Sequence, residues 1–230
     1  MAQVQGNEDS PHRCEVALVD NDSLVLSLLA KIIAKQPGLT IAWTARSGDE
    51  GLETFRKCMA GINSKPDIVI TDISMKGMSG FELASAIRFE DGDVPVLGAT
   101  SYDPYVYERE AFDSGMQGIV AKDEIEHLVR AVCLLVRGVP MHMEHGGSFE
   151  TAAAAHARLT SQEKPAMLLL SDNEREVMDL CVQGFSTRQI AERLGVSSST
   201  VKTYVSRAAR KLDVRSRREA VAVWAKKTGM

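Results

Sequence analysis

Short apolar runs alternate with segments of helical spacing between residues 14 and 137, and this alternation is the feature that most limits the possible folds. The apolar runs predict five strands, at 15–19, 40–45, 67–71, 95–99 and 118–121. Leu24, Leu28 and Ile32 recur at every fourth position of the first intervening segment, as in a helix. Strands that alternate with helices predict an α/β domain with a doubly wound, five-stranded parallel sheet.

The C-terminal part has a different pattern, in which every segment is helical. Capping boxes at Ser171, Ser186 and Ser216, with Ser197 as a further N-cap, predict four helix starts. Gly195 provides a tight turn between the second and third of these helices, which is the spacing of a helix-turn-helix. This part therefore predicts a compact all-α domain of four helices.

The chain divides into four parts on this basis. We predict a flexible tail at 1–13, an α/β domain at 14–137, a linker at 138–170 and the helical domain at 171–230. The linker contains turn residues without a hydrophobic period, and its alanine-rich run at 150–158 has little to bury if it is helical.

Composition excludes several classes of protein. The chain is 44% hydrophobic and 25% charged, as in ordinary globular proteins. No apolar run approaches the roughly 20 residues that span a bilayer, and the polar start lacks the apolar core of a signal peptide. The four cysteines are scattered without a CxxC pair, which argues against a disulfide framework or a zinc site. We expect a cytoplasmic protein with no membrane partner.

Net charge differs between the two halves. Residues 171–230 carry 12 Lys and Arg against 7 Asp and Glu, a balance of +5 within a chain whose net charge is −4. The remainder is therefore at −9. An acidic front and a basic end predict different partners for the two halves.

Polar side chains follow the predicted strands at the carboxyl edge of the sheet. They are Asp20 and Asn21, Asp72, Thr100 and Lys122. Ligands of doubly wound sheets bind at this edge. Two converging carboxylates repel each other unless a cation joins them, and Mg²⁺ prefers such oxygen ligands. A carboxylate can also attack phosphorus, after which a hydroxyl and an ammonium group can hold the phosphoryl oxygens.

Each of these residues also has a simpler interpretation. Asp20 and Asp22 are common types of N-cap for a helix that begins at Ser23. Asp72 alone is a possible turn residue, and Lys122 alone a possible surface lysine. Their joint placement at the strand ends favours a functional site.

The third C-terminal helix is amphipathic. Val201, Val205, Ala208 and Leu212 form an apolar stripe toward the core. The opposite face carries Ser199, Lys202, Thr203, Ser206 and Arg210. Residues 202–227 hold nine Lys and Arg against two Asp and Glu. A solvated charged helix is the simpler alternative, but the helix-turn-helix spacing favours binding in the major groove of DNA.

These motifs resemble the bacterial two-component response regulators, with a receiver domain followed by a LuxR-type (NarL/FixJ-like) helix-turn-helix domain. The receiver resemblance rests on LVDND, DIVITDISMKGMSG, VPVLGATS and GIVAKD, and the second on STRQIAERLGVSSSTVKTYV and KLDVRSRREAV. The resemblance implies a flavodoxin-like receiver fold. It further implies that Asp72 is the phospho-acceptor and that Thr100 and Lys122 hold the phosphoryl group. Asp20, Asp72 and the Ser74 carbonyl would bind Mg²⁺, with Asn21 as a further oxygen ligand.

In the helical domain the resemblance implies DNA contacts from Lys202, Thr203 and Ser206. Charge and helical position add phosphate contacts from Arg188, Arg207 and Arg210. Glu174 and Glu192 resemble acids that support the fold. Ala220, Val221, Val223 and Trp224 lie along the last helix, where packing within the domain and a dimer interface are both open interpretations.

The sequence departs from the family pattern at three positions. Asn21 stands where a second acid is usual, Lys76 where proline is usual after the acceptor, and Ile119 where an aromatic residue is usual before the lysine. Tyr102 is an aromatic residue on another loop.

The resemblance implies a phosphorylation-controlled transcription regulator, not an enzyme. A sensor histidine kinase would phosphorylate Asp72, and a homodimer would then read an inverted-repeat site on double-stranded DNA. One alternative is a phosphorylation-independent DNA-binding regulator whose degenerate receiver is a fixed dimerisation module. Another is a phosphoryl relay whose C-terminal part binds protein.

Overall fold

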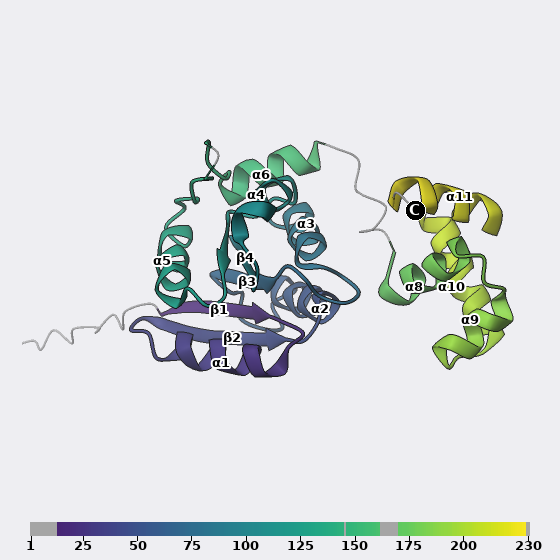
Figure 1. Ribbon diagram of the computed structural model, residues 1–230, viewed down its shortest axis with the longest axis horizontal. Helices are drawn as coiled ribbons and strands as arrows, with labels where there is room; N and C mark the ends of the chain where they lie inside the picture. The colour runs from purple at the N-terminus through teal and green to yellow at the C-terminus, as the bar shows by residue number, and fades with distance from the viewer. Residues whose placement is uncertain (1–12, 145, 162–169, 229–230) are drawn as a thin grey trace, which may run out of the picture.

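The computed structural model describes residues 13–144, 146–161 and 170–228. An α/β domain and a helical domain follow each other along the chain (Figure 1). The strands are β1 (Cys14–Val19), β2 (Leu39–Ala45), β3 (Ile68–Asp72), β4 (Val96–Thr100) and β5 (Gly118–Ala121). They form one parallel sheet in the order β2-β1-β3-β4-β5. The predicted fold class is confirmed, and the predicted strand bounds differ from these by one residue at most.

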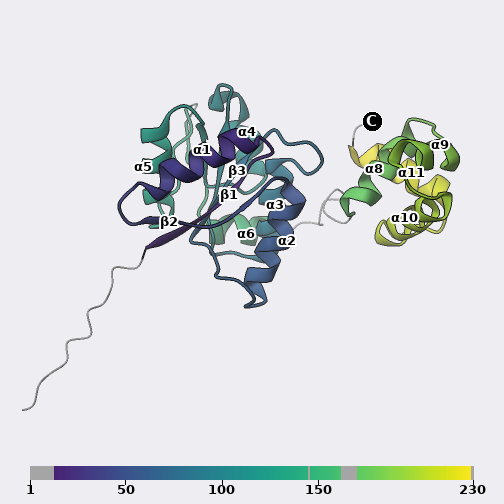
Figure 2. The same cartoon turned by 90° about the horizontal axis from the view of Figure 1, so that it is seen from below.

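Helices cover both faces of the sheet (Figures 1 and 2). Those of the α/β domain are α1 (Ser23–Ala34), α2 (Gly48–Met59), α3 (Gly80–Glu90), the 3-10 helix η1 (Pro104–Tyr107), α4 (Glu108–Asp113) and α5 (Ile125–Leu135). One apolar core lies between the sheet and α1 with α5, and the other between the sheet and α2, α3 and α4. Strand residues alternate between the two cores, as the period of two requires: Val16 and Leu18 face one core, while Ala17 and Val19 face the other.

Ser47 precedes α2 as its N-cap. Ser47 accepts a hydrogen bond from the Glu50 amide at the start of α2. The Glu50 carboxylate accepts from the Arg46 amide at 2.7 Å, and not from the amide of Ser47 as in a reciprocal capping box. The first turn of α2 is therefore capped from both sides, although the capping box is not reciprocal.

Helix α1 forms as predicted, but the row of residues that indicated it is not its buried face. Leu24 and Leu28 are 80% and 58% exposed, whereas Leu26, Leu29 and Ile33 are buried against the sheet. A helix that is apolar on several sides has no single stripe from which the sequence identifies the core face.

The segment after α5 contains a further helix, α6 (Ala152–Thr160). A helix here was expected to have little to bury, yet Ala152, Ala155 and Leu159 are buried, as is Phe149 just before it. Helix α6 packs beside α3 (Figure 1). These apolar residues are short or widely spaced, which explains why their burial was not evident from the sequence.

The helical domain consists of α8 (Asp172–Val182), α9 (Thr187–Leu194), α10 (Ser198–Lys211) and α11 (Arg217–Thr228). Gly195 adopts φ 65° at the end of α9, a left-handed conformation that suits glycine and turns the chain into α10. Two apolar clusters hold the four helices together, and Trp224 of α11 is buried in one of them. Its indole donates a hydrogen bond to the Asp179 carboxylate at 2.7 Å.

Candidate functional site

Three charged side chains meet at the carboxyl edge of the sheet. Asp20 follows β1, Asp72 ends β3 and Lys122 follows β5. The Lys122 ammonium lies 2.8 Å from Asp20 Oδ2 and 3.0 Å from Asp72 Oδ1. Both carboxylates are buried, with residue exposures of 2% and 6%. The structure therefore brings together the two predicted acids and the predicted lysine in one largely buried cluster.

Strand β3 holds Asp72 rigidly because all of its residues are buried between β1 and β4. The Ser74 amide donates to Asp72 Oδ1 at 3.2 Å, which orients the carboxylate. Gly80 begins α3 so close to the strand end that a Cβ there would lie 2.2 Å from the Asp72 carbonyl oxygen. The glycine in this loop therefore allows α3 to start directly beside the acid.

Asp20 and Asp22, in the loop between β1 and α1, have different roles. The Asp22 amide donates to Asp20 Oδ1 at 2.8 Å and orients that carboxylate toward the cluster. The Asp22 carboxylate accepts from the Leu24 and Val25 amides at 2.8 and 3.2 Å, which caps α1. The simpler interpretation as a helix cap thus holds for Asp22 and not for Asp20, while Asn21 between them is exposed.

Thr100 is the last residue of β4 and is 1% exposed. Its hydroxyl accepts from the Tyr102 amide at 3.0 Å, and its carbonyl accepts from the Lys122 amide at 2.7 Å. Thr100 is thus next to Lys122 at the edge that carries the acids. Ile119 is buried within β5, whereas Tyr102 is 64% exposed. The aromatic side chain nearest to the cluster in sequence therefore points to solvent.

The donor set at this edge fits a magnesium ion. Lys122 supplies one positive charge against the two carboxylates of Asp20 and Asp72, so the cluster has a formal charge of −1. Among residues 13–144, 146–161 and 170–228, no three His, Cys, Asp or Glu side chains form a metal-binding group. Magnesium needs only one or two carboxylates because water and carbonyl oxygens complete its shell. Asp20, Asp72 and the Ser74 carbonyl would hold the ion.

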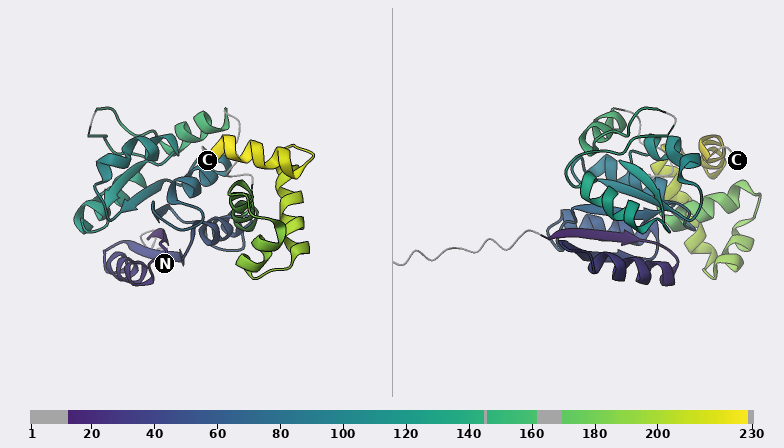
Figure 3. Two further views of the ribbon diagram at one scale, coloured as in Figure 1. Left: turned by 45° about the vertical axis from the view of Figure 1, so that its right-hand side comes forward. Right: turned by 60° about the vertical axis from the view of Figure 1, so that its left-hand side comes forward.

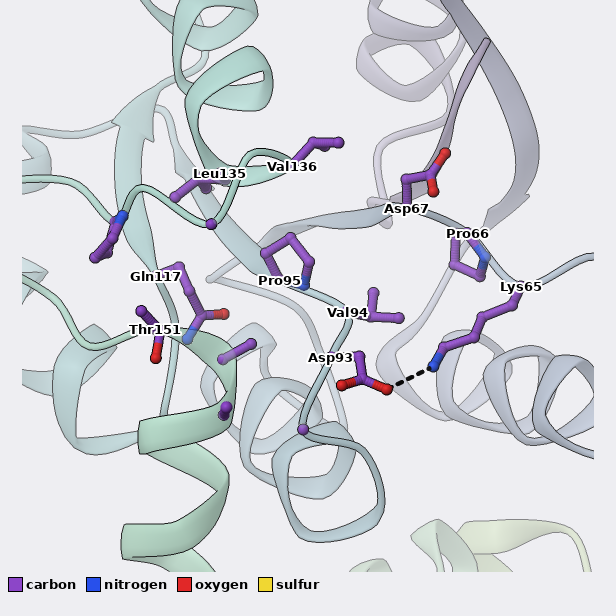
Figure 4. Close-up of a pocket in the computed structure, with 15 residues that line it drawn as sticks. Lys65, Pro66, Asp67, Asp93, Val94, Pro95, Gln117, Leu135, Val136 and Thr151 are labelled. Carbon is purple, nitrogen blue, oxygen red and sulfur yellow. Dashed lines mark ion pairs between the residues drawn. The ribbon is translucent and has the colours of Figure 1, made fainter. Parts of the chain in front are cut away.

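The opposite edge of the sheet carries a cavity of about 560 Å³ (Figure 4). Asp67, Pro95 and Gln117, which line it, all precede their strands in sequence. Lys65 pairs there with Asp93 at 3.6 Å. This cavity lies at the amino ends of the strands, away from the carboxylate cluster, so it is not part of the candidate site.

Helix α10 presents the polar face that the sequence predicted. Val201, Val205, Ala208 and Leu212 are buried. The side chains of the opposite face are exposed, namely Ser199, Lys202, Thr203, Ser206 and Arg210. Small hydroxyl groups and basic groups thus share one open helical face, which suits a helix laid in the major groove.

The basic surface extends beyond the residues that sequence reasoning named. A groove of about 820 Å³ runs beside α10 and is lined by Lys202, Ser206, Arg210, Arg215 and Arg217, among others. Arg215 and Arg217 were counted in the net charge of this region but were not predicted as individual site residues. The run of three arginines around Ser216 was the available signal.

The remaining predicted residues of the helical domain have identifiable surroundings. Arg188 is exposed and pairs with Glu192 at 3.0 Å, and Arg207 is exposed on α10. Glu174 is buried, accepts from the Ser171 amide at 2.9 Å and pairs with Lys211 at 2.6 Å. Glu174 therefore links the start of α8 to the end of α10, which agrees with a supporting role.

Known families match both halves of the chain. Residues 16–133 match the family described as response regulator receiver domain, and residues 168–224 match bacterial regulatory proteins, luxR family. The chain is 28% identical over 212 residues to the nitrate/nitrite response regulator protein NarL of Escherichia coli K12, covering 91% of this chain and 93% of that protein. It is 25% identical over 207 residues to the transcriptional regulatory protein DesR of Bacillus subtilis, covering 90% and 94%.

Solved structures share the fold. A two-component response regulator of the LuxR family from Aurantimonas sp. SI85-9A1 superposes with a TM-score of 0.52 at 24% identity, covering 65% of this chain and 99% of that one. The receiver domain of the putative response regulator NarL from Mycobacterium tuberculosis gives 0.50 at 23% identity, covering 56% and 99%.

The parallel sheet with its carboxylate–lysine edge and the helix-turn-helix domain together define a receiver joined to a DNA-binding domain. The chain belongs to the two-component response regulators with a LuxR-type DNA-binding domain, a family of transcription regulators. In the part of the chain that the structure describes, no helix combines the length and apolar character needed to cross a bilayer.

Proposed function

We propose that this protein is a transcription regulator that is switched by phosphorylation of Asp72. The observation that carries the proposal is the bridge from Lys122 to the buried carboxylates of Asp20 and Asp72. A cation placed between two buried acids at the carboxyl edge of a parallel sheet is suited to receive further negative charge there.

In the proposed reaction a carboxylate oxygen of Asp72 attacks the phosphorus of a histidine kinase phosphohistidine or a small phosphodonor. The new P–O bond forms as the bond from phosphorus to the donor breaks, and the donor leaves with its electron pair. Lys122 pairs with a phosphoryl oxygen, and the Thr100 hydroxyl turns from the Tyr102 amide to donate to another. A bound Mg²⁺ would offset the negative charge of the carboxylates and the phosphoryl oxygens.

The DNA-binding domain would read its site through α10. Lys202, Thr203 and Ser206 would contact bases or backbone, and the arginines Arg188, Arg207 and Arg210 would contact phosphates. We propose that the phosphorylated protein forms a homodimer on an inverted-repeat site, because a two-fold dimer of helix-turn-helix domains matches a palindromic sequence. In the described structure Ala220 and Trp224 pack within the domain, so a partner would meet the half-buried Val221 and Val223.

The alternative of a phosphorylation-independent regulator has one observation in its favour. Asn21, where a second acid is usual, is exposed and carries no charge, so the cluster contains only two carboxylates. Weaker binding of Mg²⁺ would leave the receiver as a fixed dimerisation module.

Treatment with acetyl phosphate and Mg²⁺ distinguishes the two functions. Intact mass spectrometry should show one added phosphoryl group on the wild type and none on Asp72→Asn, and light scattering should show a shift toward dimer in the wild type only. If the wild type gains no phosphoryl group at any Mg²⁺ concentration while it still dimerises and binds DNA, the fixed-module function is correct.

A further inference from the structure

The chain after α5 folds back onto the α/β domain as a strap, defined here as the described residues 139–144 and 146–150. The Met141 amide donates to the Gln117 carbonyl at 3.0 Å, and the Phe149 amide to the Met141 carbonyl at 2.9 Å. Met141 occupies the space over Gly118, where a Cβ would lie 2.2 Å from its sulfur. Phe149 is 3% exposed in the core beneath α3 and α4. The strap is therefore built into the receiver.

The strap holds the beginning of α4. Glu108, the first residue of this helix, is 6% exposed, and its two carboxylate oxygens accept from the Glu144 amide at 2.9 and 3.1 Å. A buried carboxylate without a hydrogen-bond donor or a cation is strongly unfavourable, so the Glu144 amide stabilises Glu108 in this position.

Helix α6 holds the other end of α4. Arg158 donates to the Phe112 carbonyl at 2.7 Å and to the Asp113 carbonyl at 3.4 Å. Its guanidinium lies 4.8 Å from the centre of the Phe112 ring and pairs with Glu150 at 2.8 Å. Carbonyls at a helix C-terminus lack partners within the helix, so a cation that binds them stabilises the last turn.

Helix α6 is in turn fixed to α3. The Arg88 guanidinium donates to the Ala152 carbonyl at 3.3 Å, and His156 Nδ1 lies 2.5 Å from the Arg88 carbonyl oxygen. Leu159 fills the space over Gly115, where a Cβ would lie 2.8 Å from its methyl group. The contacts of α6 thus join α4 to α3, and among the described residues α6 is the last helix before the DNA-binding domain in the chain.

Helix α4 is short and has few interactions of its own. It comprises six residues, no side chain caps its N-terminus, and only Glu108 and Ala111 within it are buried. Thr100 ends β4 shortly before it, and η1 passes directly into α4. A displacement of Thr100 toward a phosphoryl group would therefore pull on a helix that is held mainly from outside.

We propose that the strap and α6 form a clamp on both ends of α4, and that the clamp carries the response to phosphorylation from α4 to the DNA-binding domain. The clamp itself is inferred from the set of contacts that Glu108 and Arg158 make. Its role in signalling also rests on the proposed phosphorylation of Asp72.

Hydrogen exchange of the unphosphorylated protein tests the clamp. We expect the α4 amides to exchange roughly tenfold faster in Arg158→Ala, because the variant loses the charged hydrogen bonds that hold the last turn, and the partial exposure of Arg158 limits the effect. Glu108→Ala should have a similar effect, and Arg158→Lys an intermediate one because it lacks the fork that binds two carbonyls.

Two matched variants serve as controls. Arg109 also lies against the Phe112 ring, at 5.9 Å, but its charge partner is Asp113 of the same helix. Glu110 is an exposed acid of α4. Arg109→Ala and Glu110→Ala should leave α4 exchange within about twofold of the wild type, since exposed pairs contribute little. Wild-type exchange in both Arg158→Ala and Glu108→Ala would overturn the clamp.

The signalling role is tested by DNA affinity before and after acetyl phosphate. We expect Arg158→Ala to gain one phosphoryl group, as the wild type does, but to lose most of the change in DNA affinity that follows. A full change in affinity in the phosphorylated variant would overturn the signalling role. Absence of phosphorylation in the wild type would overturn the proposed function, and the exchange experiment would still decide whether the clamp exists.

Discussion

At the scale of single residues, Lys122 is the group on which the acidic cluster depends most. Its ammonium is the cation that joins Asp20 and Asp72, which are 2% and 6% exposed. Lys122→Ala leaves two buried charges facing each other, and breaking a buried pair in this way costs about 3 kcal/mol. We expect a lower midpoint of urea unfolding at pH 7, and Lys31→Ala, which alters an exposed lysine of α1, should leave it unchanged.

Removal of one acid should restore part of this loss. Asp20→Asn combined with Lys122→Ala leaves a single buried charge, so the double variant should be more stable than Lys122→Ala alone. Equal midpoints for Lys122→Ala and the wild type would show that solvent screens both carboxylates despite their burial.

The four cysteines should differ strongly in reactivity. Burial raises the pKa of Cys14 to about 11, and it also raises the pKa of Cys58 and of Cys181. Cys133 is exposed on α5. At pH 8 the reactive thiolate of Cys14 is roughly 0.1% of its population. Iodoacetamide should therefore modify Cys133 first, as peptide mass mapping would show, and Cys133→Ser should remove the fast phase. Early modification of Cys14 would contradict this.

The site residues that could be predicted from the sequence are those that follow directly at the end of a predicted strand. Asp20, Asp72 and Lys122 each lie at the end of a strand, and a parallel sheet brings such ends together. The contacts of Arg158 with α4 follow no such rule, because the partners are 46 and 45 residues away in sequence. Side-chain pairing over such distances depends on packing that periodicity does not encode.

At the scale of elements, capping residues predict reliably where a helix begins, whereas apolar spacing predicts its buried face less reliably. The serines that precede α8, α9 and α10 accept hydrogen bonds from their first turns as predicted. In α10 the apolar stripe also identified the buried face, because basic and hydroxyl residues occupy the other side. In α1 apolar residues occur on several sides, so spacing predicted the helix and not its orientation.

The exposed face of α10 leads to a prediction on DNA binding. Lys202→Ala should weaken binding to the operator and reduce the slope of log affinity against log salt by about 1, if the lysine contacts a phosphate. Fluorescence anisotropy over a salt series measures both quantities. Lys226→Ala removes the same charge from the exposed side of α11 and should change the slope little. A loss of affinity with an unchanged slope would mean that Lys202 contacts a base instead.

At the scale of the whole molecule, a side chain of the helical domain contacts the receiver. Arg175 of α8 lies 2.9 Å from Glu82 of α3 and 3.3 Å from Asp49 of α2. Its side chain is only 7% exposed, so these pairs are shielded from water. Figure 3 shows the helical domain beside the part of the receiver that carries α2. Glu82 also caps α3 through the Ser79 amide, directly after the loop that follows Asp72.

We therefore expect Arg175→Ala to separate the two domains. Loss of a shielded, hydrogen-bonded charge pair costs about 2–3 kcal/mol, which corresponds to roughly 30- to 150-fold in the equilibrium between joined and separated domains. Small-angle X-ray scattering should show a larger radius of gyration for the variant. Arg188→Ala removes an arginine whose partner Glu192 lies on the same helix, so it should leave the radius unchanged.

Measuring the radius of gyration at low and high salt distinguishes loss of the Arg175 ion pairs from a general loosening of the fold. Because the attraction between Arg175 and the acids Asp49 and Glu82 is weakened by mobile ions, 1 M salt, with a Debye length of about 3 Å, should expand the wild type toward the radius of Arg175→Ala. The variant has already lost these pairs, so salt should change its radius much less. Glu82→Gln retains an acceptor for the cap of α3 and removes only the charge, and should therefore expand the protein without melting that helix. If Arg175→Ala keeps the wild-type radius at low salt, other contacts join the domains and the two pairs are incidental.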